Sequence, residues 1–177
     1  MKKTTKITLC GLCAALSTAF MLTSYFPYLT YAIPAVAGLM AMVPLIEIGA
    51  IWGVATYAVS APLVLLFGEI EASVLYALLF GYYPVLKAII ERIDKIWIEW
   101  LIKLFCFNIA VLGAYFVGRH IFMVSYEDLG EFGKYGAVAF LALCNVVFVL
   151  YDIAISRVSV LYMSRIHPKI KRLIKHL

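Results

Sequence analysis

Charged residues are scarce in this sequence. Of its 177 residues, 14% are charged and 65% are hydrophobic, whereas a typical soluble domain is about 25% charged and about 45–50% apolar. A soluble domain of this size still exposes roughly a third of its chain surface, so a single soluble core cannot hide this much apolar sequence. The composition argues against soluble globular, disordered and nucleic-acid-binding classes. It predicts one domain whose main solvent is lipid.

The motifs of metal, nucleotide and serine-nucleophile sites are missing as well. The three histidines lie outside the long apolar runs, and neither an HExxH motif nor a pair of CxxC motifs is present, so we expect no metal. There is no Walker A loop for ATP and no G-x-S-x-G elbow. We therefore expect a chain without a cofactor that is not itself an enzyme.

Four cysteines are present, and all of them fall inside apolar runs. Disulfide frameworks belong to small secreted domains with poor cores, so we expect these thiols to be free and to behave as small buried apolar side chains. The four are Cys10, Cys13, Cys106 and Cys144.

Long apolar runs are what the sequence has in abundance. A membrane-spanning helix needs about 20 mainly apolar residues, and the second candidate is short for a full crossing, which requires thinned lipid or packing inside the protein. The six expected helices cover residues of about 7–25, 32–46, 48–67, 71–90, 96–117 and 136–163.

Basic residues gather at both ends of the chain and around the connector 91–95. Six spans place both termini on one side, and of the 15 basic residues only Arg119 and Lys134 then fall in external loops. Cytoplasmic loops carry the excess of Lys and Arg. The expected fold is therefore an all-α integral membrane protein, a six-transmembrane-helix bundle with both termini cytoplasmic, in the cell (plasma) membrane.

Ionisable and amide side chains at membrane depth are costly and call for a reason. By helical rise, Asn108 and Asn145 each lie about 14 Å below the outer surface. They either line a pocket that opens outward or form a hydrogen bond between two helices.

Lys87 and Asp152 share a depth nearer the inner surface, and we expect them to form a structural ion pair. The alternative for that pair is a conformational latch or a proton site.

Aromatic side chains crowd the outer surface. They form either an interfacial belt or a flat site for a ring-shaped ligand. On the second interpretation Arg119 suits a carboxylate, and Glu71 faces donors on the same ligand. The candidate binding residues are Tyr31, Glu71, Tyr76, Asn108, Tyr115, Arg119 and Asn145.

Small residues recur at every fourth position of the first helix, at Gly11, Ala15 and Ala19. Such a stripe lets another helix approach closely. That helix belongs either to the same chain or to a separate membrane subunit.

Taken together, these features resemble the substrate-binding S components of energy-coupling-factor (ECF) vitamin transporters. The resemblance rests on the small size, the six helices, the basic ends, the stripe of small residues, the short second helix and the long loop before the last helix. It implies capture of a vitamin or related micronutrient outside the cell, near the outer ends of the helices. It further implies that the stripe docks an ECF transmembrane coupling subunit, and that two separate ATPase subunits drive uptake.

Two other classes remain open from the residues alone. A non-transporting membrane scaffold, or an assembly factor of the cell envelope, would use the aromatics as a belt and the asparagines to join helices. A small membrane enzyme is the third class.

Overall fold

The computed structural model describes residues 2–26, 28–93, 95–122 and 136–170. Within these ranges only the backbone is described at residues 115, 118–122, 136 and 137. The described residues form helices joined by turns, and no strand is present among them. Its elements are α1 (Lys3–Leu22), η1 (Thr23–Tyr25), α2 (Ile33–Gly38), η2 (Leu39–Ala41), α3 (Met42–Glu47), α4 (Ala50–Phe67), α5 (Ile70–Leu75), the π-helical turn η3 (Tyr76–Phe80), α6 (Tyr83–Ile90), α7 (Ile96–Phe122) and α8 (Gly136–Arg165).

Five helical stretches of the described chain are long and apolar enough to cross a membrane. They are Lys3–Tyr25, Ala50–Phe67, Ile70–Ile90, Ile96–Ala114 and Val138–Arg165. The stretch Ile33–Glu47 is apolar but shorter. The prediction of an all-helical membrane protein is confirmed, with five long apolar helices and one shorter apolar stretch among the described residues.

Two of the expected helices are interrupted. The stretch Ile33–Glu47 consists of α2, η2 and α3. Pro44 lies in the first turn of α3, where a backbone N–H has no acceptor within the helix, so proline costs no hydrogen bond there. The chain breaks at Gly49, whose φ of 132° suits only glycine. The stretch Ile70–Ile90 is divided by η3, and Pro84 stands at the start of α6, so it begins that helix.

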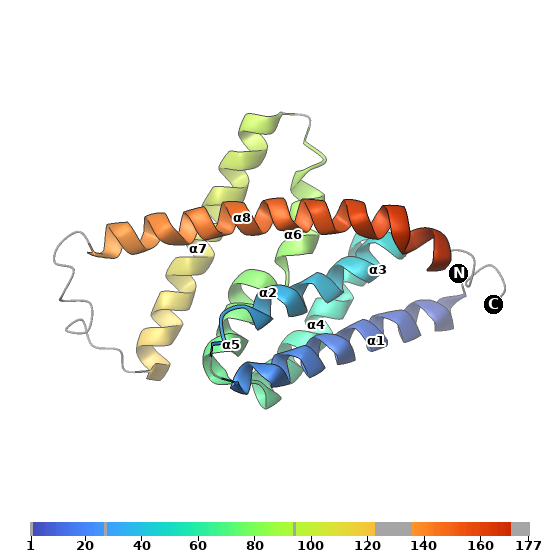
Figure 1. Cartoon of the computed structure of the whole chain (residues 1–177), viewed down its shortest axis with the longest axis horizontal. Coiled ribbons are helices and arrows are strands. Elements are labelled where there is room, and N and C mark those ends of the chain that lie inside the picture. Colours follow the sequence, from blue (N-terminus) through green and yellow to red (C-terminus); the bar gives the residue numbers. More distant parts are fainter. Residues whose placement is uncertain (1, 27, 94, 123–135, 171–177) are drawn as a thin grey trace.

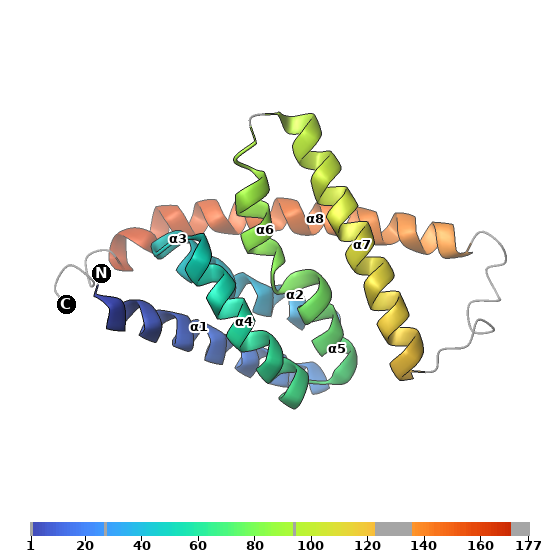
Figure 2. The ribbon, with the colours of Figure 1, turned by 180° about the vertical axis from the view of Figure 1, so that it is seen from behind.

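The helices do not all run side by side. α1 and α4 pack along each other, and α2 and α3 lie between them and α8 (Figure 1). The α6–α7 hairpin stands steeply to α8, and α7 crosses α8 in both views (Figure 2). The beginning of α1 and the end of α8 lie at the same end of the molecule in both views.

Two apolar clusters hold these elements together. The first joins α1, α2, α4, α5 and η3 through Met21, Ala37, Ala61, Val64, Ala72 and Tyr76. The second docks α8 on α3 and α6 through Met42, Tyr83, Phe148, Ile155 and Tyr162.

Many large apolar side chains face outward, among them Leu66 and Trp97, which are 75% and 90% exposed. Soluble monomers rarely expose broad contiguous apolar patches. An outward apolar surface over five long helices therefore fits a lipid environment.

Candidate functional site

Tyr31 and Glu71 meet at the surface, next to the beginning of α5. The hydroxyl of Tyr31 donates a long hydrogen bond of 3.4 Å to Oε2 of Glu71. Glu69 holds the beginning of α5 because its carboxylate accepts from the backbone N–H groups of Glu71 and Ala72, at 3.1 and 2.8 Å. The negative charge of Glu71 raises the pKa of the Tyr31 phenol. Sequence reasoning had placed Tyr31 and Glu71 in one site, and the structure brings them together with both side chains exposed.

Tyr76, another predicted binding residue, is fully buried. Its hydroxyl lies 2.9 Å from Ser17 Oγ on α1 and 2.6 Å from Ser60 Oγ on α4. Ser17 in turn donates to the carbonyl of Ala37, at 2.8 Å. The hydroxyl of Tyr76 is therefore already engaged inside the protein, where it joins η3 to α1 and α4.

Asn108 and Asn145 form a reciprocal amide pair between α7 and α8. The Nδ2 of Asn108 donates to Oδ1 of Asn145 at 3.0 Å, and the return bond measures 3.2 Å. Each amide also donates at 2.8 Å to a carbonyl of its own helix, that of Leu104 or Leu141. These bonds use all the amide N–H groups of the pair, as expected of an interhelical hydrogen bond. A ligand would have to open the pair to reach it.

The side chains of Tyr115 and Arg119 lie outside the described residues. Within the described ranges, no hydrogen bond links Tyr31 or Glu71 directly to Asn108 or Asn145. That the seven predicted binding residues share one site stays a prediction.

Lys87 and Asp152 are in contact, as the sequence suggested. Lys87 Nζ lies 2.6 Å from Oδ1 of Asp152, and both side chains are only 5% exposed. The hydroxyl of Tyr83 donates to the same oxygen at 2.5 Å. A buried ion pair persists only where hydrogen bonds satisfy its remaining lone pairs and protons, and Tyr83 provides one of them.

Lys103 belongs to the same cluster, a role that sequence reasoning missed. Its side chain is 1% exposed, and its Nζ lies 2.6 Å from Glu99, 3.0 Å from Glu91 and 3.3 Å from Asp152. The ring of Trp100 lies 5.4 Å from the same nitrogen. The signal was present in the sequence, because Lys87–Glu91 and Glu99–Lys103 are both i,i+4 pairs of opposite charge.

A second missed polar contact ties α3 to the end of α8. The Glu47 side chain is 4% exposed. It accepts a hydrogen bond of 2.9 Å from the hydroxyl of Tyr162, and Nδ1 of His167 lies 2.9 Å from the same oxygen. A lone carboxylate at the end of an apolar run is the signal that could have marked it.

The small-residue stripe faces outward. Gly11, Ala15 and Ala19 are exposed, whereas Cys13, Ala14 and Ser17 on the opposite side of α1 are buried. A Cβ added at Gly11 would meet nothing within 4 Å. Packing within the described chain therefore does not use the stripe.

The cysteines are free, in line with the sequence interpretation. Cys10 and Cys13 are buried, while Cys106 and Cys144 are only half-buried. Within the described residues, no group of three or more His, Cys, Asp or Glu side chains is placed to hold a metal ion.

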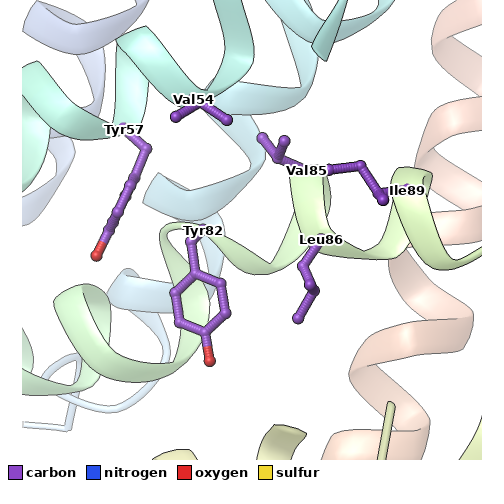
Figure 3. A pocket seen from close by; sticks show the side chains of 6 residues that line it. All are labelled: Val54, Tyr57, Tyr82, Val85, Leu86 and Ile89. Carbon is purple, nitrogen blue, oxygen red and sulfur yellow. The ribbon is translucent and has the colours of Figure 1, made fainter. Parts of the chain in front are cut away.

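Two apolar grooves indent the surface. The first, of about 230 Å³, lies between α4 and α6, as Figure 3 shows, and is lined by Val54, Tyr57, Tyr82, Val85, Leu86 and Ile89. The second, of about 190 Å³, is lined by residues of α2, η2 and α8, such as Ala35 and Val158. Both are smaller than the 300–1,000 Å³ typical of small-molecule pockets. Neither is lined by a predicted binding residue.

Comparison of the chain with models of known protein families, with curated proteins and with solved structures finds no match. The resemblance to S components of ECF transporters therefore stays a prediction from the sequence.

Proposed function

We propose that this chain is the substrate-capture subunit of an ATP-driven importer for a vitamin or related micronutrient. In this proposal six helices cross the plasma membrane, with Ile33–Glu47 as the short sixth crossing and both termini in the cytoplasm. A separate ECF transmembrane coupling subunit and two ATPase subunits supply the energy. The sequence contains no nucleotide-binding motif of the Walker type, which fits that division of labour.

The observation that carries the proposal is the outward face of α1. Gly11, Ala15 and Ala19 are exposed along one side of the helix. Small residues at this spacing let a second helix approach closely in lipid. Since the described chain does not fill this face itself, it is available to a membrane subunit.

The six-span topology has support of its own. The beginning of α1 and the end of α8 lie at one end of the molecule (Figures 1 and 2), as two cytoplasmic termini require. Lys2, Lys3 and Lys6 precede or begin α1, and the basic residues Arg165 and Lys169 follow near the end of α8. Basic residues at both ends agree with a cytoplasmic location.

The proposal is tested by a bulky substitution in the stripe. We expect Ala15→Leu to prevent co-purification with the coupling subunit and the ATPases, because the added side chain holds the partner helix away. Ala58→Leu is the matched control, since Ala58 is also exposed but lies on α4, and it should leave the complex intact. If wild-type chain isolated from its native membrane brings down no ATPase subunits, the importer proposal is wrong.

Ligand binding is tested separately on the purified chain. A screen of vitamins and their precursors by thermal unfolding should find one compound that stabilises the protein. At about 100 times its dissociation constant a ligand adds about 2.7 kcal/mol. Tyr31→Phe should reduce this stabilisation without unfolding the chain, because the Tyr31 hydroxyl lies at the exposed surface.

The second candidate function is a non-transporting membrane scaffold or assembly factor. The Asn108–Asn145 pair favours it, because both amides are satisfied within the protein. A scaffold would show neither a stabilising small molecule nor associated ATPases. The two experiments above therefore separate the candidates.

A further inference from the structure

The buried ionic cluster joins three helices with an unequal distribution of charge. Lys87 of α6 pairs at 2.5 Å with Glu91, which directly follows that helix, and α7 contributes Glu99 and Lys103, which pair at 2.6 Å. The α6–α7 hairpin is thus neutral within this cluster. α8 contributes Asp152 alone, so the assembled cluster has one negative charge in excess.

Asp152 depends entirely on the hairpin for its partners. In the part of the chain that the structure describes, the cations at its carboxylate are Lys87, at 2.6 Å, and Lys103, at 3.3 Å, and the hydroxyl donor is Tyr83. All three belong to α6 or α7, and the carboxylate side chain is 5% exposed. If α8 moved away from the hairpin, the hairpin would keep its three internal ion pairs, while the Asp152 carboxylate would lose every partner.

Apolar contacts at the same crossing cannot replace this attachment. Phe148 of α8 stacks on Phe107 with ring centroids 4.2 Å apart and meets the edge of Tyr83 at 5.0 Å. Lipid chains are as apolar as these rings, so membrane helices gain no hydrophobic driving force by associating. Polar contacts therefore have a larger share in deciding whether α8 stays docked.

We propose that Asp152 is a releasable latch, a carboxylate that, beside the Asn108–Asn145 amide pair, holds α8 against the self-neutral α6–α7 hairpin. The proposal concerns the conformation of the chain and does not depend on the importer function. Removing the charge of Asp152 leaves a neutral, internally paired hairpin that still folds. The change therefore weakens the docking of α8 without destabilising α6 and α7.

The test measures how often α7 and α8 meet. Asn108→Cys and Asn145→Cys are placed in a chain whose four native cysteines are Ala, and the two thiols are joined by a short bifunctional thiol reagent in lipid nanodiscs. The amides at these positions contact each other in the docked state, so the rate of cross-linking reports docking. We expect Asp152→Asn to lower this rate about tenfold, which corresponds to about 1.4 kcal/mol in the docking equilibrium.

Glu99→Gln is the matched control, because it removes the same charge from the same cluster without touching α8. It should cross-link at the rate of the parent chain. An Asp152→Asn chain that cross-links as fast as the parent overturns the proposal, and so does an equal loss of rate in Glu99→Gln. The first result would mean that contacts other than those of Asp152 hold α8.

A second variant keeps the test decisive if Asp152→Asn does not give a folded protein by size exclusion. Tyr83→Phe preserves every charge and removes only the 2.5 Å hydrogen bond to Asp152. It should lower the cross-linking rate by a smaller factor than the tenfold expected of Asp152→Asn. A rate equal to that of the parent in Tyr83→Phe overturns the proposal in that case.

Discussion

Lys103→Met should be among the most destabilising single substitutions in this chain. The lysine side chain is 1% exposed, and its Nζ faces the carboxylates of Glu99, Glu91 and Asp152 at 2.6, 3.0 and 3.3 Å. Methionine fills similar space without a charge. After the change, Lys87 alone opposes three carboxylates, and two negative charges are left in excess.

The expected loss follows from the burial of these groups. Removing one partner of a buried ion pair costs about 3–5 kcal/mol, because the remaining charge stays buried without compensation. Glu91 is 40% exposed, so water screens part of the excess charge. We therefore expect a loss near the lower limit, about 3 kcal/mol, which lowers the Tm of a chain of this size by roughly 6–12 °C.

The measurement is thermal unfolding of the detergent-solubilised protein, followed by tryptophan fluorescence. Trp100 lies beside Lys103, so its emission reports the cluster directly. Adding Glu99→Gln to Lys103→Met should recover part of the loss, because it removes one of the excess charges. Lys95→Met is the control, since Lys95 is exposed in the connector before α7. If Lys103→Met lowers the Tm no more than Lys95→Met does, the reasoning about buried charge is wrong.

Two other predictions concern the surface pair and the glycines. Glu71→Gln should lower the pKa of the Tyr31 phenol toward its ordinary value of about 10, because the charge of Glu71 is the main cause of the raised pKa. NMR of fluorinated tyrosine measures this pKa. An unchanged pKa would contradict the assignment of the shift to Glu71. Because the raised pKa belongs to the folded state, this pair stabilises the protein below pH ~10 and its contribution is lost as the pH rises through the folded-state pKa. Gly49→Ala should cost about 1–3 kcal/mol, since its φ of 132° strains any other residue, whereas Gly11→Ala, in open helical space, should stabilise α1 by up to about 1 kcal/mol. Thermal unfolding of the two variants measures both changes, and equal Tm values would contradict the conformational argument.

Much of the fold could be predicted because membrane helices are marked by composition. Runs of apolar residues interrupted by Pro, Gly and charged connectors locate the helical stretches directly. The interruptions were harder to predict, because a proline in an apolar run can break, kink or begin a helix; the structure places Pro44 and Pro84 in the first turns of α3 and α6. A proline in the first turn begins a helix rather than breaking it, because the backbone N–H that proline lacks would have no partner within the helix at that position.

Within the candidate site, the sequence predicted pairs of residues that contact each other, but not the direction in which each side chain points. Depth along a helix follows from a fixed rise per residue, and so the matched depths of Asn108 and Asn145, and of Lys87 and Asp152, led to real contacts. Rotation about the helix axis does not follow from depth. Tyr76 was expected to face a ligand, but it points inward, where two serine hydroxyls engage it.

The sequence by itself determined the membrane environment of this protein, its helical class and the approximate positions of its long helices. These properties depend on composition and on local hydrogen bonding within each segment. Only the tertiary structure decided which faces meet. It turned the stripe at Gly11, Ala15 and Ala19 outward, and it brought Lys103 of α7 into contact with Asp152 of α8. Lys103 and Asp152 lie far apart in the chain, and their contact, like the outward direction of the stripe, depends on how the helices cross, which no local pattern of residues encodes.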